Sequence, residues 1–301
     1  MVDFAPLYVR ATLDTCERAL SNTSSRHSDG TFEGARGTQI YYQAWTPPGK
    51  PKAILALAHG IGEHSGRYAH VADYFARMNY AFWACDLRGH GKSGGKRGHV
   101  DSFDDYLADV DRLIRIAKEP TPATKTFLIG HSLGGLIGPC YAVKYSGEVA
   151  GLILSGTAVR DKVKASPVKV FLARALSPVI PTFTARTGLD PNLISRDPEV
   201  VRKYVQDPMV HGVVTARWYT EYRRAQEETM RAANKLTLPC LILQSGADGI
   251  VDASMTAEFF KKIASSDKTL KVYDGFYHEV LNEPGKESVF GDIDTWLSAR
   301  T

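Results

Sequence analysis

The sequence has few cysteines and no long apolar run, and both absences exclude classes of protein. Only four cysteines occur in 301 residues, they are widely spaced, and no two have CxxC spacing. Metal-ligand spacing is therefore absent, and a disulfide framework is not expected. The N-terminus lacks a continuous apolar stretch, so neither a secretory signal nor a membrane span is expected. These features predict a cytoplasmic protein, with peripheral association to a membrane as an open alternative.

An excess of charge of one sign is also missing. The chain has 37 Lys and Arg against 33 Asp and Glu, a formal net charge of +4, and no block of basic residues stands out. This bias is too weak to indicate binding to nucleic acid. Hydrophobic residues make up 44% of the chain, and its length suffices for one well-packed domain that carries a modest insertion.

Apolar runs alternate with helical patterns along much of the chain. Residues 53–58 and 80–85 are apolar runs typical of strands buried on both faces, and residues 67–78 between them have the spacing of an amphipathic helix. A further strand is expected at 126–129, followed by another helix. This alternation predicts the α/β class, with a mostly parallel sheet and helices on both faces.

The alternation stops after Ser155 and resumes near Cys240. The block between them mixes basic and apolar residues and contains no clear buried strand. We therefore predict a core formed by residues 38–155 and 236–301, interrupted at 156–235 by a helical cap. Residues 1–37 are interpreted as an N-terminal extension of unknown role, within which residues 4–20 have the pattern of a short helix.

One strand-to-helix junction carries the motif G-x-S-x-G, at residues 130–134. A motif in this setting is typical of the α/β-hydrolase fold, which we therefore predict. The serine occupies a sharp turn that lifts its hydroxyl above the sheet edge, and the helix N-terminus favours developing negative charge. The motif recurs at residues 91–95, but no apolar strand leads into that copy and no helix follows it. Ser132 is therefore the predicted nucleophile, and Ser93 is assigned to a glycine-rich loop.

A serine nucleophile needs a base, and the base needs an acid that orients it. In this fold the chain order is serine, acid, histidine. His278 follows the last expected strand, whereas His211, the other downstream histidine, falls in the predicted cap. Asp248 ends the preceding strand and is the predicted acid. Asp252 is the rival, although capping of the next helix is its favoured role.

The tetrahedral intermediate of acyl transfer needs two N–H donors. One is expected from the backbone of Leu133, directly after the nucleophile, and the other from the loop at residues 59–63. Within that loop the predicted donor is Ile61. We interpret His59 as a structural residue of the loop.

Several longer strings resemble the monoacylglycerol lipases, particularly the bacterial members. They are HGIGEHSGRY at 59–68, DLRGHGKS at 86–93, GHSLG at 130–134, ISRDP at 194–198, DP at 207–208 and YHE at 277–279. The resemblance extends from about residue 38 to the C-terminus. It implies hydrolysis of monoacylglycerols to fatty acid and glycerol through an acyl-enzyme, by Ser132, Asp248 and His278, with no cofactor and no metal.

The resemblance also implies how substrate is bound. Glu63 and Arg67 match polar residues that help to orient the glycerol end. Two positions depart from the mammalian pattern: Leu281 stands where those members carry a histidine, and Val251 where they carry a cysteine. The polar end of the pocket is therefore expected to differ from theirs.

The predicted cap has apolar residues suited to an acyl chain. Among them, Phe171, Leu176 and Ile180 are expected to line the acyl pocket. A second interpretation is that the cap lies on an anionic lipid surface, because basic residues accompany the apolar ones. These basic residues are Lys162, Lys164, Lys169 and Arg174. Packing of the apolar face on the core, with solvated charges, is the equal alternative.

The expected partner is a small lipid ester and not nucleic acid. Three classes of function remain at this point: a monoacylglycerol lipase, another hydrolase on the same scaffold, such as a lysophospholipase or a general carboxylesterase, and a non-catalytic binding module. The fold alone does not separate them. A complete set of serine, histidine and aspartate disfavours the third class.

Overall fold

The computed structural model describes residues 25–163 and 166–301. Cys16, Lys164 and the helical pattern at residues 4–20 lie outside these ranges. Within the described part of the chain, no helix is both long enough and apolar enough to cross a bilayer.

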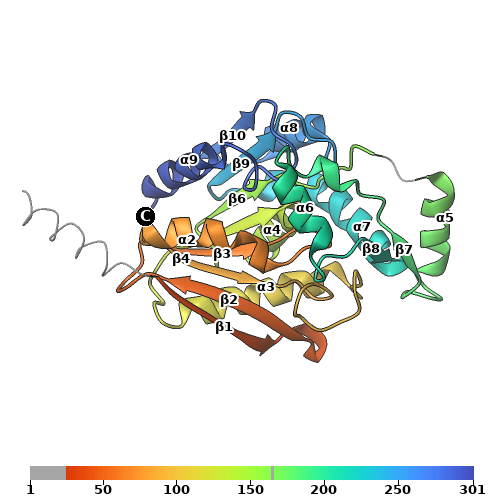
Figure 1. Cartoon of the computed structure of the whole chain (residues 1–301), viewed down its shortest axis with the longest axis horizontal. Coiled ribbons are helices and arrows are strands. Elements are labelled where there is room, and N and C mark those ends of the chain that lie inside the picture. Colours follow the sequence, from red (N-terminus) through yellow and green to blue (C-terminus); the bar gives the residue numbers. More distant parts are fainter. Residues whose placement is uncertain (1–24, 164–165) are drawn as a thin grey trace, which may run out of the picture.

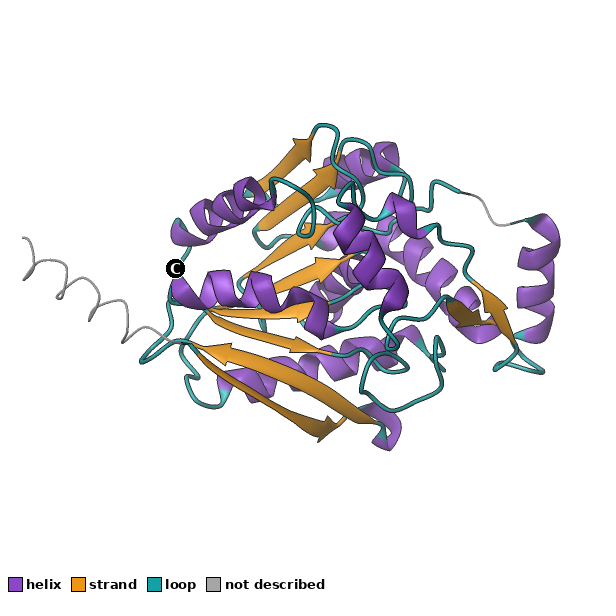
Figure 2. Cartoon of the chain, viewed as in Figure 1, coloured by secondary structure: helices purple, strands orange, loops and turns teal. Residues whose placement is uncertain are grey.

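An eight-stranded sheet forms the centre of the molecule, in the order β1-β2-β4-β3-β5-β6-β9-β10 (Figure 2). Its strands are β1 (Arg26–Glu33), β2 (Gln39–Thr46), β3 (Ile54–Ala58), β4 (Ala81–Cys85), β5 (Thr126–His131), β6 (Gly151–Ser155), β9 (Cys240–Ser245) and β10 (Lys268–Tyr273). Strand β2 runs antiparallel to β1 and β4, and the remaining pairs are parallel. The predicted mostly parallel α/β fold is confirmed.

Helices cover both faces of this sheet, and each face has its own apolar core (Figure 1). The 3-10 helix η2 (Ser65–Tyr68), α2 (Ala69–Arg77) and α9 (Lys286–Ser298) lie on one face, and α3 (Phe103–Lys118), α4 (Leu133–Lys144) and α8 (Ala253–Lys262) on the other. Alternate residues of β3 enter the two cores: Leu55 packs in one, Ile54 and Ala56 in the other. Burial on both faces explains why these strands read as unbroken apolar runs.

The insertion after β6 contains two different parts. The outer part projects from one end of the molecule (Figure 1) and includes α5 (Pro167–Leu176) and a small sheet of β7 (Thr184–Arg186) and β8 (Val213–Thr215). The 3-10 helix η3 (Pro191–Leu193) and α6 (Pro198–Gln206) lie between these strands in the sequence. The small sheet is a feature that the helical prediction lacked, because its strands are only three residues long.

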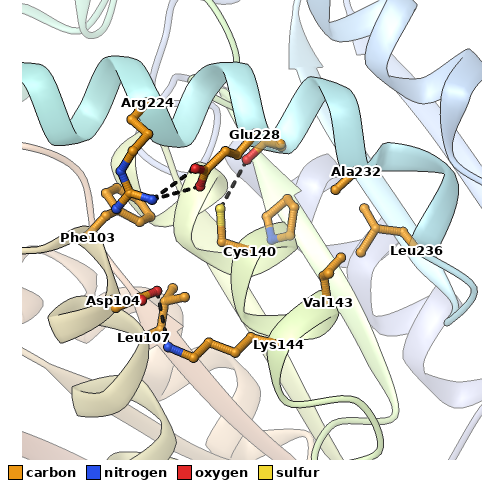
Figure 3. A pocket seen from close by; sticks show the side chains of 12 residues that line it. Phe103, Asp104, Leu107, Cys140, Val143, Lys144, Arg224, Glu228, Ala232 and Leu236 are labelled. Atoms are coloured by element: carbon orange, nitrogen blue, oxygen red, sulfur yellow. Dashed lines mark hydrogen bonds and ion pairs between the residues drawn. The ribbon is translucent and has the colours of Figure 1, made fainter.

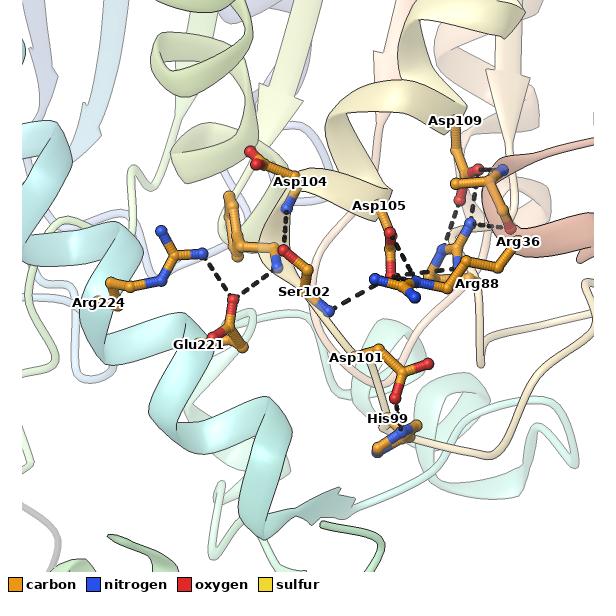
Figure 4. Close-up of polar contacts among 12 residues, drawn as sticks. Arg36, Arg88, His99, Asp101, Ser102, Asp104, Asp105, Asp109, Glu221 and Arg224 are labelled. Atoms are coloured by element: carbon orange, nitrogen blue, oxygen red, sulfur yellow. Dashed lines mark hydrogen bonds and ion pairs between the residues drawn. The ribbon is translucent and has the colours of Figure 1, made fainter. Parts of the chain in front are cut away.

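The last part of the insertion packs on the core. It comprises α7 (Ala216–Ala232) and the 3-10 helix η4 (Ala233–Lys235). Trp218 and Tyr222 of α7 belong to the same apolar core as α3 and α4. Glu221 accepts hydrogen bonds from the backbone N–H of Phe103 (2.8 Å) and from Arg224 (2.6 Å), which ties α7 to the start of α3 (Figure 4). A cavity of about 210 Å³ remains between α3, α4 and α7 (Figure 3), and no predicted site residue lines it.

Residues 26–33 belong to the sheet, although the sequence analysis placed them in an N-terminal extension. Strand β1 pairs with β2 along its full length, and the 3-10 helix η1 (Ala35–Gly37) follows. The exposed Arg36 contacts Asp105 of α3 at 2.9 Å. The buried Arg88 binds both Asp109 of α3 (2.7 Å) and the carbonyl of Ala35 (2.9 Å), so these contacts join the segment to α3 (Figure 4). Strand β1 is largely exposed and polar, which removes the apolar alternation that reveals a strand.

Candidate active site

Ser132 lies in a strained turn between β5 and α4. Its backbone has φ 53° and ψ −108°, a region that non-glycine residues seldom adopt. The turn is so tight that a Cβ on Gly130 would lie 2.2 Å from the carbonyl oxygen of Gly134, and a Cβ on Gly134 would lie 1.9 Å from that of Ala58. Both positions therefore require glycine, and the turn places Ser132 at the N-terminus of α4.

Asp248 and His278 are brought together from the loops that follow β9 and β10. The Nδ1 of His278 lies 2.9 Å from Oδ2 of Asp248, and both side chains are buried. The other carboxylate oxygen of Asp248 accepts from the backbone N–H groups of Ile250 (2.8 Å) and Val251 (2.9 Å). Asp252 instead caps α8 through the N–H of Ser254, as predicted.

The electrostatics of this pair favour an ionised acid and a basic imidazole. Burial opposes the charge on Asp248, but His278 and two backbone N–H donors outweigh it, so the pKa of Asp248 is lowered. Burial likewise opposes a charged His278, but the carboxylate of Asp248, with smaller effects of Glu279 and Glu63, outweighs burial and raises the pKa of His278. An Asp248 carboxylate that accepts from Nδ1–H leaves Nε2 of His278 free to accept a proton.

Two backbone N–H groups beside Ser132 are available to a ligand. Within residues 25–163 and 166–301, neither the N–H of Ile61 nor that of Leu133 donates to a protein acceptor. The loop that carries Ile61 is held by His59, whose Nδ1 donates to the carbonyl of Gly60 (2.7 Å) and whose Nε2 accepts from the N–H of Leu87 (2.9 Å). His59 is therefore structural, as expected.

A cavity of about 320 Å³ contains Ser132 and Ile61 in its wall. Most of the wall comes from the insertion and from the loop after β9; its side chains include Leu189, Leu193, Val214, Trp218, Tyr219, Tyr222, Ile250 and Val251. A second cavity of about 340 Å³, beneath α5, shares several lining residues with the first. The two cavities are thus adjacent, one at Ser132 and the other under the outer part of the insertion.

The chain matches the serine aminopeptidase S33 family over residues 49–285. It is 38% identical over 279 residues to a monoacylglycerol lipase of Mycolicibacterium smegmatis, a match that covers 92% of this chain and 98% of that protein. It is 34% identical to the human monoglyceride lipase, with 89% of each chain covered. The chain belongs to the monoacylglycerol lipase family.

A solved structure of the family agrees with this assignment. The monoacylglycerol lipase of Paleococcus ferrophilus superposes with a TM-score of 0.80 at 32% identity, over 87% of this chain and 99% of that one. The predicted resemblance to monoacylglycerol lipases, particularly to bacterial members, is thus confirmed. The members of this family are ester hydrolases, and the chain is one of them.

The predicted substrate residues of this chain lie outside the cavity that contains Ser132. Phe171 is 70% exposed, and Phe171, Leu176 and Ile180 line neither cavity described above. Glu63 and Arg67 also lie outside the wall of the Ser132 cavity and are bound to other protein groups. These placements differ from the roles that the resemblance implies.

Sequence reasoning missed the cavity residues of α7. Trp218, Tyr219 and Tyr222 line the cavity beside Ser132, and their aromatic cluster at helical spacing was the available signal. Ser93, by contrast, has a structural role as expected: its hydroxyl donates to the carbonyl of Asp86 and accepts from the N–H of Tyr41. Among the described residues, no three His, Cys, Asp or Glu side chains are grouped so as to hold a metal.

Proposed function

We propose that this protein hydrolyses monoacylglycerols to fatty acid and glycerol, with Ser132 as nucleophile, His278 as base and Asp248 as the orienting acid. One observation carries the proposal. The structure combines a buried, hydrogen-bonded Asp248–His278 pair with a serine that lies on a strained turn in the wall of a largely apolar cavity. Membership of the monoacylglycerol lipase family supports the choice of substrate.

In the proposed mechanism, Nε2 of His278 takes the hydroxyl proton as Ser132 attacks the ester carbonyl. The N–H groups of Ile61 and Leu133 stabilise the resulting oxyanion, and each such donor typically contributes about 3 kcal/mol. His278 then gives its proton to the departing glycerol oxygen, which leaves an acyl-enzyme. Water, deprotonated by the same histidine, attacks the acyl carbonyl and releases the fatty acid. No cofactor is needed for any of these steps.

The acyl chain is proposed to occupy the cavity that contains Ser132 and to continue into the adjacent cavity under α5. Burial of each methylene contributes about 0.8 kcal/mol, so medium and long chains should react faster than acetyl esters. Leu172 and Phe183 line the second cavity and replace Phe171, Leu176 and Ile180 as its proposed acyl contacts. Removal of either side chain should slow long-chain esters more than acetate esters.

The outer part of the insertion is proposed to rest on a lipid surface. Helix α5 has no buried residue, which disfavours the alternative that its apolar face packs on the core. The exposed apolar residues of this region that line neither cavity are Val168, Phe171, Val179 and Ile180. Lys169 and Arg174 are exposed on the same helix, and such a mixture suits an anionic surface. We assign the cap to residues 156–235, with α7 as its anchor on the core.

A substrate panel tests the function. The purified protein is assayed on monoacylglycerols, diacylglycerols, triacylglycerols, lysophospholipids and nitrophenyl esters, with Ser132→Ala as the matched inactive variant. We expect monoacylglycerols to be hydrolysed fastest and the variant to be inactive. Faster hydrolysis of triacylglycerols or lysophospholipids would refute the substrate, and an active Ser132→Ala variant would refute the mechanism.

The surface contact has a separate test. Phe171→Ser should reduce co-sedimentation with phosphatidylcholine–phosphatidylglycerol vesicles, while activity on a water-soluble nitrophenyl butyrate stays unchanged. Equal sedimentation of the variant and the parent protein would refute the contact.

A further inference from the structure

Arg67 joins two loops whose relative position must stay fixed in the proposed mechanism. Its Nη1 donates to Oε2 of Glu63 at 2.5 Å and to Oε1 of Glu279 at 2.7 Å, and its Nη2 donates to Oε2 of Glu279 at 2.6 Å. Glu63 belongs to the loop that carries Ile61, and Glu279 directly follows His278. One guanidinium thus bridges the loop of the oxyanion donor and the loop of the histidine.

On the oxyanion side, Glu63 fixes the backbone of its own loop. Its Oε1 accepts from the N–H of Gly60 at 2.6 Å and from the hydroxyl of Tyr68 at 2.8 Å. Gly60 immediately precedes Ile61, so this carboxylate holds the peptide next to the proposed donor. The fit is close, because a Cβ on Gly60 would lie 2.8 Å from Glu63 and 3.2 Å from the Cβ of Ser132.

On the histidine side, Glu279 is held at several points. Its carboxylate also accepts from Nδ2 of Asn282 at 2.8 Å, and its backbone N–H donates to the carbonyl of Ile194 at 2.9 Å. The neighbouring N–H of His278 contacts the carbonyl of Leu193 at 3.4 Å. The carboxylate that Arg67 binds is thus one of several contacts that hold this loop, and the only one of them that reaches the loop of Ile61 is its contact with Arg67.

Burial makes this contact strongly dependent on charge. The side chains of Glu63 and Glu279 are 3% and 4% exposed and that of Arg67 is 10% exposed, with the ring of Tyr204 lying 4.8 Å from its guanidinium. Burial alone would raise the pKa of Glu63. The charge of Arg67, together with His131, His59 and the hydrogen bond from Tyr68, outweighs burial and lowers this pKa to about 2. Without the guanidinium, two buried carboxylates would lie near each other with no positive charge between them. Either the two loops would move apart or one of the carboxylates would take up a proton.

The same contacts leave Arg67 poorly placed to bind the glycerol group. Neither Glu63 nor Arg67 lines the cavity that contains Ser132, and the guanidinium already bonds to both carboxylates. We propose that Arg67 is a positioning residue. It fixes the loop that carries Ile61 relative to the loop that carries His278, for every ester that the enzyme hydrolyses. This inference rests on the proposed roles of Ser132, His278 and Ile61.

The test compares esters with and without glycerol. Arg67→Lys and Arg67→Gln are assayed on monodecanoylglycerol and on nitrophenyl decanoate, which have the same acyl chain. A positioning role predicts that kcat falls by the same factor on both esters, roughly 10²-fold for a misplacement near 1 Å, with KM within about twofold. A loss confined to monodecanoylglycerol and to KM would show that Arg67 binds glycerol and would overturn the proposal.

The matched control is Arg300→Lys. Arg300 also binds one carboxylate, that of Asp267, with two nitrogens and lies over an aromatic ring, Trp296, at 4.2 Å, but none of these residues lines the Ser132 cavity. Its kcat on both esters should match that of the parent protein. If the control loses as much activity as the Arg67 variants, a general loss of stability explains the effect of Arg67, and the proposal is overturned.

A second substitution covers the case in which the Arg67 variants fail to fold. Glu279→Gln keeps the shape of the partner and removes its charge, and it should lower kcat on both esters alike. Unchanged kcat in folded Glu279→Gln would refute the bridge. If the parent protein hydrolyses nitrophenyl decanoate but not monodecanoylglycerol, the proposed substrate fails, whereas kcat on the nitrophenyl ester still tests the positioning role.

Discussion

Replacement of Gly134 by alanine tests whether the turn at Ser132 leaves room for any side chain. A Cβ at this position would lie 1.9 Å from the carbonyl oxygen of Ala58 and 2.6 Å from its carbonyl carbon. Both atoms belong to the backbone of a buried strand, so neither can move aside as a flexible side chain would. An ordinary contact begins near 3.4 Å, so the start of α4 would have to shift by roughly 1.5 Å. A misplacement of about 1 Å can lower the rate of catalysis 10²-fold.

Two opposite effects on stability sharpen this prediction. Alanine favours a helix over glycine by about 1 kcal/mol, so the substitution would stabilise the protein if space were available. Gly291 in α9 has no atom within 4 Å of such a Cβ and is the matched control. We expect Gly291→Ala to raise Tm and keep activity, and Gly134→Ala to lower both. Measurements are Tm, kcat on a nitrophenyl ester and the rate of fluorophosphonate labelling; parental values of kcat and labelling rate for Gly134→Ala would refute the reasoning.

Three further predictions concern the proposed catalytic residues. Ser132→Ala should abolish turnover with the Tm preserved, whereas Ser93→Ala should keep most activity; the reverse result in a hydrolysis assay would exchange their roles. Asp248→Asn should lower kcat by about 10⁴, by analogy with the same change in a serine protease, and Asp252→Asn should lower it far less, so the opposite ranking in steady-state kinetics would make Asp252 the acid. The base must be neutral, so kcat/KM should rise with pH through the raised pKa of His278, with a midpoint above the ordinary value for histidine. Because the Asp248 carboxylate is the main cause of the raised pKa, Asp248→Asn should move the midpoint of its residual activity to lower pH, and an unmoved midpoint in the pH profile would contradict this origin.

Much of the framework was readable from local sequence patterns, for a physical reason. Strands such as β3, buried on both faces, must be apolar at every position, and a tight turn such as residues 130–134 must carry glycines where backbones meet. Each of these constraints acts within a few residues. The sequence also predicted Asp248 and His278 from the ends of two strands, because parallel strands bring their carboxyl ends to one edge of the sheet. The structure places these two side chains in contact.

Only the tertiary structure revealed other contacts between residues that are far apart in the sequence. The contact of Arg67 with Glu279 joins residues 212 positions apart, and no local pattern in either segment specifies the other. The same holds for the cavity wall: α5 was chosen from its apolar composition, but composition does not reveal whether a helix faces the cavity or solvent, and Phe171 faces solvent. Strand β1 was missed because an exposed edge strand can be polar and still gain its hydrogen bonds from a neighbour that only the fold supplies.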